Sequence, residues 1–285
     1  MYVLCSPCIL NPNLRAEGIT KPSDIEAFRR TKERCDEFGI QMVPLPCPET
    51  LYLGPARQPG TFLERLDSPA FSRLLDDLET EVKELIRKNG PPLCIIGVNS
   101  SPTCGVATTY YGSRGDEPPK RAGRGVFLSR FPGIPAMDTI TFSLYRVYLA
   151  APLFSAAERS YNAGIASLLR EHFFSVHLPQ DGGDDTASRG KQEHERLFRL
   201  NLAALEKSDI VVAVIDGADA DSGTSWEMGY AHARGKKVIG LRTDFRQVGI
   251  DERVNLMLEQ SSTLVSNEEQ LLDAVSAPTL VKEDR

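Results

Sequence analysis

Two carboxylates near the start of an expected helix have the types and spacing that glycosidic chemistry requires. Asp221 lies in a loop, and Glu227 follows in the first turn of that helix. One carboxylate of such a pair can attack an anomeric carbon while the other handles the proton of the leaving group. Between them stand Ser222, Gly223 and Thr224, whose N–H groups are suited to a sugar hydroxyl or a phosphate. An ordinary helix start would look the same, because the helix dipole favours Glu there and Asp-Ser-Gly is common in turns.

The cysteines are a second group of residues that could carry out chemistry. All six lie within the first 104 residues: Cys5, Cys8, Cys35, Cys47, Cys94 and Cys104. Cys8 (or Cys5), Cys47 and Cys104 each follow an expected strand, and open α/β sheets bind ligands outside the carboxyl ends of their strands. Because they are scattered over three loops, they fit a soft-metal or iron–sulfur site better than a zinc ribbon. We expect Cys35 and Cys94 to be small buried hydrophobic residues.

Parallel sheets must position both groups, and the chain alternates strand-like and helix-like segments. In the first half, strands are expected at residues 2–4, 41–45 and 93–98, and helices at 22–38 and 69–89. In the second half, strands are expected at 145–150, 173–177, 209–215 and 238–241, and helices at 156–172, 193–207 and up to 234. This order predicts an α/β chain of two domains, 1–143 and 144–285, the second with a doubly wound parallel sheet. The Gly-, Pro- and Arg-rich stretch 105–143 is expected to contain the linker, with the boundary of the smaller first domain near its end, at about residue 143.

The composition argues against several classes of function. The net charge is −6 with 25% charged residues, which disfavours a broad nucleic-acid interface. No apolar run approaches the roughly 20 residues of a membrane helix, and the first residues do not resemble a signal peptide. We therefore expect a cytoplasmic protein that acts on a small molecule. The four histidines show no ligand spacing and are expected to be structural: His172, His177, His194 and His232.

Three segments of the second half resemble the signature segments of nucleoside 2-deoxyribosyltransferases: residues 148–154 (YLAAPLF), 221–231 (DSGTSWEMGYA) and 255–257 (NLM). The resemblance implies a flavodoxin-like fold and Glu227 as a nucleophile that forms a covalent glycosyl intermediate. It implies that Tyr148 positions Glu227 and that Asp221 contacts the base or sugar. It also implies a homo-oligomer in which Asn255 reaches the active site of a neighbouring subunit.

One position departs from that family. Where relatives carry an Asp that contacts the base and helps to protonate it, this chain has Asn201. An amide can hydrogen-bond the edge of a base but cannot supply a proton. Either Asp221 takes that role or the base departs more easily, so simple N-glycosidic cleavage is favoured over transfer between two ordinary bases. The sequence leaves open whether water or a base accepts the sugar, and whether a nucleoside or a 5′-monophosphate is the substrate.

Segments around the cysteines resemble the thiouracil desulfidase family over about residues 1–128: 8–10 (CIL), 47–49 (CPE) and 101–105 (SPTCG). The resemblance implies a [4Fe–4S] cluster held by Cys8, Cys47 and Cys104, with one open iron that takes the sulfur of the substrate. Glu49 and Ser101 would manage the proton and the water that replace sulfur by oxygen. Residues 11–13 (NPN) depart from the family and leave the substrate choice open.

Together the two resemblances predict a bifunctional enzyme for thiolated pyrimidine nucleosides, nucleotides or bases. A thiolated base would be a leaving group for one domain and a substrate for the other. Two alternatives remain open at this point. One is a nucleoside 5′-monophosphate N-hydrolase with an inactive first domain, and the other is a nucleotide-binding sensor with a structural metal module.

Overall fold

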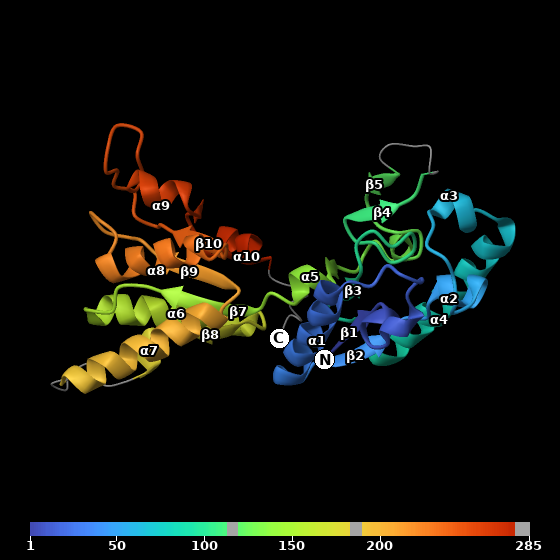
Figure 1. Cartoon of the computed structure of the whole chain (residues 1–285), viewed down its shortest axis with the longest axis horizontal. Coiled ribbons are helices and arrows are strands. Elements are labelled where there is room, and N and C mark those ends of the chain that lie inside the picture. The colour runs from blue at the N-terminus through green and yellow to red at the C-terminus, as the bar shows by residue number, and fades with distance from the viewer. Residues whose placement is uncertain (113–118, 183–189, 277–285) are drawn as a thin grey trace. The chain divides into compact units, whose positions relative to one another are not determined.

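The structure is a computed structural model that describes residues 1–112, 119–182 and 190–276 (Figure 1). The chain divides into two compact units, and the division falls between Ser143 and Leu144. Each unit contains its own parallel sheet. Among the described residues, no helix combines the length and the apolar character that crossing a membrane requires.

The first unit is built around a four-stranded parallel sheet in the order β2-β1-β3-β6. The strands are β1 (Tyr2–Cys5), β2 (Gln41–Pro44), β3 (Ile95–Gly97) and β6 (Ala136–Asp138). All four residues of β1 are buried, as is typical of a central parallel strand. The strand order reverses between β1 and β3, and such a reversal is where open α/β sheets bind ligands.

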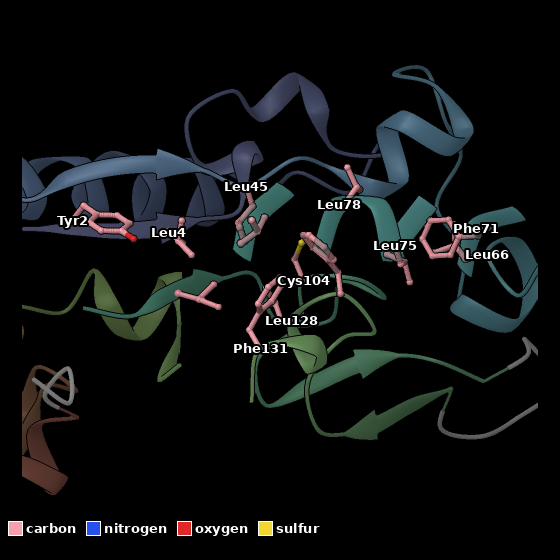
Figure 2. Close-up of a cluster of buried hydrophobic side chains, with 13 residues drawn as sticks. Tyr2, Leu4, Leu45, Leu66, Phe71, Leu75, Leu78, Cys104, Leu128 and Phe131 are labelled. Atoms are coloured by element: carbon pink, nitrogen blue, oxygen red, sulfur yellow. The ribbon is translucent and has the colours of Figure 1, made fainter. Parts of the chain in front are cut away.

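Helices and short turns complete the first unit. They are η1 (Pro7–Ile9), η2 (Pro12–Leu14), α1 (Pro22–Glu37), α2 (Pro48–Leu53), α3 (Phe62–Arg65), α4 (Pro69–Asn89), η3 (Leu128–Arg130) and α5 (Thr139–Phe142), with the hairpin β4 (Thr108–Tyr110) and β5 (Lys120–Ala122). The Ser68 hydroxyl caps α4 by accepting from Phe71 N at 3.1 Å. The helix then buries Phe71, Leu75 and Leu78 at helical spacing, in one cluster with Leu4 (Figure 2).

The stretch 105–143, which the sequence analysis expected to contain a linker, packs as part of the first unit. It supplies β6 to the sheet and the side chains of Phe127, Leu128 and Phe131 to the core. At Gly125 a Cβ atom would lie 2.4 Å from the carbonyl carbon of Thr103, so only glycine fits against this backbone. This glycine therefore reflects a close approach of two chain segments and not a flexible connection.

The second unit has a five-stranded parallel sheet in the order β11-β10-β9-β7-β8. The strands are β7 (Arg146–Ala150), β8 (Ser175–His177), β9 (Ile210–Val214), β10 (Lys237–Leu241) and β11 (Thr263–Val265). Read from the other edge and numbered along the chain, this is the 2-1-3-4-5 order of flavodoxin-like folds. The predicted α/β class and the flavodoxin-like second sheet are therefore confirmed.

The helices of the second unit are α6 (Ala156–Glu171), η4 (Pro179–Gly182), α7 (Lys191–Lys207), α8 (Ser222–Ala233), α9 (Leu256–Gln260) and α10 (Glu268–Val275). Helices α7 and α8 pack against each other and against β7. Their contact with the sheet is a core that contains Leu205, Met228 and Ala231 together with Tyr148 and Val211. Most of the loop expected between residues 180 and 190 lies outside the described residues. The order reversal between β7 and β9 places the carboxyl ends of these strands beside the start of α8.

Candidate active sites

Asp221 determines where α8 begins. Its Oδ2 accepts a hydrogen bond from Thr224 N at 3.0 Å, which makes it the N-cap, and the helix starts at Ser222. Glu227 is therefore the sixth helical residue and not in the first turn, as the sequence analysis expected. The helix dipole acts mainly within the first turn, so it does not by itself explain a Glu here.

Glu227 is paired with a buried tyrosine of the neighbouring strand. The Oη atom of Tyr148 donates to Glu227 Oε1 at 2.5 Å, and Tyr148 is fully buried. Burial raises the pKa of Glu227 to about 7; the Tyr148 hydrogen bond lowers it and the charge of Asp221 raises it. Burial and the nearby Glu227 raise the pKa of Tyr148, so this hydroxyl keeps its proton and acts as the donor. Oε2 of Glu227 is left without a side-chain donor from the described part of the chain.

A pocket of about 360 Å³ opens beside Glu227 between α7 and α8. Its lining consists of Phe198, Asn201, Leu202, Leu205, Gly223, Trp226 and Glu227. Trp226 stacks on Tyr230 with ring centroids 5.3 Å apart, and its ring lies 6.1 Å from that of Phe198. The sequence analysis missed both aromatic residues of the lining. Both are highly exposed for large apolar side chains, which is typical of a binding surface. The sequence alone does not reveal this exposure.

Asn201, which lines this pocket, forms a polar pair with His177. The Nε2 atom of His177 lies 3.1 Å from Asn201 Oδ1, and the imidazole stacks on the Tyr148 ring at 5.3 Å. Asn201 therefore lies at the pocket, as the sequence analysis expected of a substrate contact. His177, which was expected to be merely structural, contacts two residues of the site.

The other residues of this unit that were expected to contact the substrate do not all lie at the pocket. Ser222 and Gly223 are exposed, and Gly223 lines the pocket. Thr224 is buried, and both its N–H and its hydroxyl are directed to Asp221. Asn255 is exposed and is the N-cap of α9, where its Oδ1 accepts from Met257 N at 3.0 Å. It does not line the pocket beside Glu227.

In the first unit, three cysteines come together past the carboxyl ends of neighbouring strands. Cys8 lies in η1 after β1, Cys47 is the N-cap of α2 after β2, and Cys104 follows β3. Burial raises the pKa of Cys8 to about 12; the Cys47 sulfur is close enough to raise the pKa values of both Cys8 and Cys104, and Cys8 also raises that of Cys104. Cys35 and Cys94 are buried, as expected, and Cys5 is buried in β1, where it interacts with both Cys35 and Cys8.

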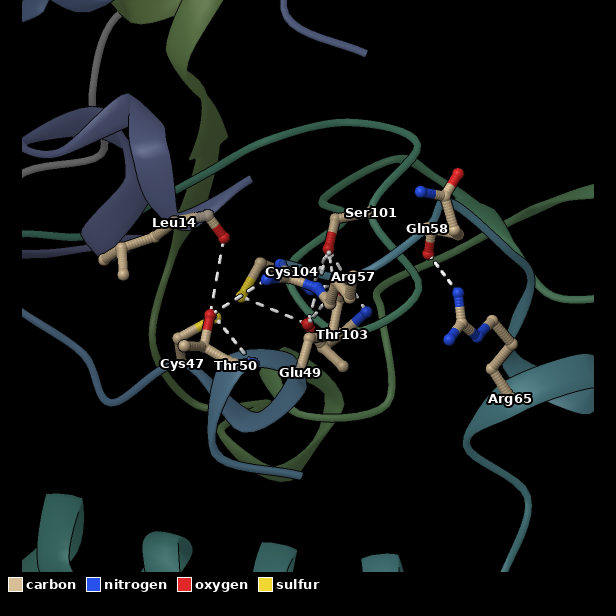
Figure 3. A network of polar contacts seen from close by, with 10 residues as sticks. All are labelled: Leu14, Cys47, Glu49, Thr50, Arg57, Gln58, Arg65, Ser101, Thr103 and Cys104. Atoms are coloured by element: carbon tan, nitrogen blue, oxygen red, sulfur yellow. Dashed lines mark hydrogen bonds and ion pairs between the residues drawn. The ribbon is translucent and has the colours of Figure 1, made fainter. Parts of the chain in front are cut away.

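A carboxylate network adjoins these sulfurs (Figure 3). Oε1 of Glu49 accepts from the hydroxyls of Ser101 at 3.0 Å and Thr103 at 2.8 Å. Oε2 accepts from Nε of Arg57 at 3.3 Å, and this arginine is almost completely buried. The structure therefore brings Glu49 and Ser101 together, as expected. Arg57 and Thr103 were missed, because nothing in their local sequence links them to Glu49.

The donor set fits an iron–sulfur cluster in its chemistry. Burial holds the pKa values of the Cys8 and Cys104 thiols above their ordinary range, so both remain neutral until a cation binds, and metal binding deprotonates a thiol outright. The buried hydroxyl of Ser6 makes no hydrogen bond of normal geometry within the described residues, yet it lies near enough to Cys104 to lower the pKa of that thiol. It is thus available to an acceptor beside the sulfur.

The described residues do not form a site for a single metal ion. Within residues 1–112, 119–182 and 190–276, no group of three or more His, Cys, Asp or Glu side chains is placed to hold one ion.

Comparison with known proteins concerns the second unit. Residues 147–270 match the model of the nucleoside 2-deoxyribosyltransferase family. An uncharacterized protein of Ureaplasma parvum is 30% identical over 115 residues, which cover 35% of this chain and 72% of that protein.

Solved structures are similar to part of the chain. A conserved protein of Enterococcus faecalis V583 is 29% identical, with a TM-score of 0.40, over 47% of this chain and 98% of that one. The 2-deoxyribosyltransferase of Bacillus psychrosaccharolyticus is 22% identical, with a TM-score of 0.39, over 44% of this chain and 89% of that one.

Proposed function

Because residues 147–270 form a nucleoside 2-deoxyribosyltransferase family domain, we propose that the second unit cleaves N-glycosidic bonds through a covalent intermediate on Glu227. The family supports glycosyl transfer or hydrolysis as the reaction class. The observation that carries the proposal is the Tyr148–Glu227 pair at the edge of an open pocket. A half-buried carboxylate that is oriented by a protonated hydroxyl is the arrangement of an activated nucleophile.

The geometry supports a different role for each oxygen of Glu227. Tyr148 holds Oε1, so Oε2 is the atom that attacks the anomeric carbon. The bond from this carbon to the base nitrogen breaks, and its electron pair leaves with the base. Water or a second base then attacks the same carbon, and the Glu227 carboxylate is released. The exposure of Ser222 and Gly223 at the start of α8 supports binding of a sugar hydroxyl or a 5′-phosphate there.

The domain would work as part of a homo-oligomer. Asn255 is exposed on α9 and lies outside the pocket of its own chain. An exposed Asn can complete the site of a neighbouring copy, which is the role that the family resemblance gives it. Sedimentation of the purified protein tests the oligomer, and an Asn255→Ala variant tests the shared site.

Release of free base tests the proposed reaction. The purified protein should liberate bases from deoxyribonucleosides, ribonucleosides or their 5′-monophosphates, as measured by chromatography. Adding a second base distinguishes transfer from hydrolysis, because only transfer yields a new nucleoside. A protein that binds these compounds but releases no base from any of them would instead be a nucleotide-binding sensor.

The pH dependence should report on Glu227. Because only the carboxylate form attacks and its pKa is raised to about 7, kcat/KM should rise with pH through about 7. In Tyr148→Phe the hydrogen bond that lowers this pKa is lost. The midpoint should therefore move to higher pH, by about one unit for one lost hydrogen bond. A midpoint that stays in place, or moves to lower pH, would contradict the assignment of Glu227 as the titrating group.

For the first unit we propose a second activity, the replacement of sulfur by oxygen in a thiolated pyrimidine. The convergence of Cys8, Cys47 and Cys104 beside the Glu49 network supports it. A [4Fe–4S] cluster held by these cysteines would supply a Lewis-acidic iron for the sulfur. Glu49 would accept a proton from the attacking water, and Ser101 would orient that water. The water oxygen replaces the sulfur, which leaves as hydrogen sulfide, so no oxidant or reductant is needed.

A further inference from the structure

The pocket beside Glu227 offers a bound base very few polar contacts. Among the residues that line it, Asn201 and Glu227 have polar side chains, whereas Phe198, Leu202, Leu205 and Trp226 are mainly apolar. In a pocket of this kind, a few polar groups determine which ligand is accepted. Since Glu227 is engaged with Tyr148 and the sugar, Asn201 is the side chain that can recognise the base.

His177 fixes the orientation of Asn201. The amide oxygen Oδ1, which lies 3.1 Å from His177 Nε2, can only accept, so the ring nitrogen must carry the hydrogen. The imidazole is itself held by stacking on Tyr148 at 5.3 Å and an interplanar angle of 22°. With its oxygen engaged, Asn201 has its NH₂ group left to donate to a ligand.

A donor that cannot give up its proton selects among leaving bases. When the glycosidic bond breaks, the electron pair passes to the base nitrogen, and the base becomes an anion unless an acid protonates it. The Asn201 amide cannot transfer a proton, but its N–H can stabilise negative charge on a carbonyl or thiocarbonyl. Uracil-type anions spread their charge over two such groups. Cytosine and adenine carry an amino group and depart readily only after protonation of a ring nitrogen.

Building on the function proposed above, we infer that the second unit selects nucleosides or nucleotides whose base leaves as an anion stabilised by carbonyl or thiocarbonyl groups. Uracil and thiouracil belong to this class, and cytosine and adenine do not. Asn201 contacts the base, and His177 is a positioning residue that holds Asn201 in its donor orientation.

The ratio of kcat/KM for deoxyuridine to that for deoxycytidine tests this inference, with each compound assayed as the nucleoside and as the 5′-monophosphate. The wild type should prefer the uracil compound. In Asn201→Asp the new carboxyl group can protonate the base, so the ratio should fall by about 100-fold or more. His177→Phe keeps a ring on Tyr148 but frees the amide, and the ratio should fall about tenfold. Asn267→Asp, a conservative change at the N-cap of α10, should leave the ratio unchanged.

A preference of the wild type for cytosine or adenine compounds would overturn the inference, and so would a ratio unaltered in a folded Asn201→Asp variant, with folding checked by thermal melting. A 2-deoxyribosyl pyridinium separates this failure from a failure of the proposed function, because its leaving group departs as neutral pyridine without any proton. If the wild type cleaves it and Glu227→Gln does not, the proposed function stands whatever the base preference. If the wild type leaves it intact and also releases no base from any nucleoside or 5′-monophosphate, the proposed function itself fails.

Discussion

Replacement of Glu227 by Gln should lower kcat for base release by about 10⁴-fold or more, the scale of losses when a catalytic nucleophile is removed. The amide has nearly the same shape as the carboxylate and can still interact with the Tyr148 hydroxyl, so the pocket should keep its form. It lacks the negative charge that attacks the anomeric carbon. Binding of a nucleoside should therefore change far less than its turnover.

Mass spectrometry provides a direct measurement of the intermediate. In the wild type, rapid quenching with substrate should leave a sugar adduct on the peptide that contains Glu227, and the Gln variant should show none. Glu206→Gln is a matched control, because Glu206 accepts hydrogen bonds from Tyr230 and Arg234 on the surface of the same unit. It should release base at the wild-type rate. Full turnover in Glu227→Gln would show that another group is the nucleophile.

Replacement of Cys47 by Ala should prevent the first unit from holding an iron–sulfur cluster. Cys47 Sγ accepts hydrogen bonds from Thr50 N at 3.4 Å and Thr50 Oγ1 at 3.1 Å, and these two donors orient the sulfur. Changing residues that only support a ligand costs about 10- to 100-fold in metal affinity, and removal of the ligand should cost at least as much. Iron and sulfide should be measured after anaerobic reconstitution, together with the visible absorption.

Cys35→Ala supplies the control for this experiment, because Cys35 is a buried thiol of α1 for which we propose no role as a ligand. It should take up iron and sulfide as the wild type does. Equal loading of Cys47→Ala and the wild type would remove Cys47 from the ligand set. A wild type that takes up no iron would leave the first unit without the proposed desulfuration.

The main elements could be predicted because their sequence signals are local. The β-branched run of β9 (Ile210–Val214) marks a buried parallel strand, and Pro22 marks the start of α1. Strand β6 was missed because its three residues, Ala136–Asp138, carry no periodic pattern. It becomes a strand only by pairing with β3, about 40 residues earlier in the chain.

Site residues, too, were predicted where the sequence signal is local and missed where it depends on contacts between distant segments. Glu227 and Tyr148 stand in segments whose residue types resemble a known family, so the pair could be expected before the structure. The contact of His177 with Asn201 spans 24 residues and depends on how β8 and α7 pack, which no local pattern encodes. The start of α8 was misplaced because Asp221 is itself the cap, and loop and cap use the same residue types.

The two units have separate cores, so their sites can differ in sensitivity to oxidants. The core around Leu4 is built from the first unit, and the core around Val211 is built from the second. Cysteine sulfur is a target of oxidants, whereas carboxylates such as Glu227 are not. Under oxidative stress the chain would therefore lose the proposed sulfur chemistry of the first unit and keep the proposed glycosidic cleavage of the second. Thiolated bases released by the second unit would then accumulate, since the first unit would no longer consume them.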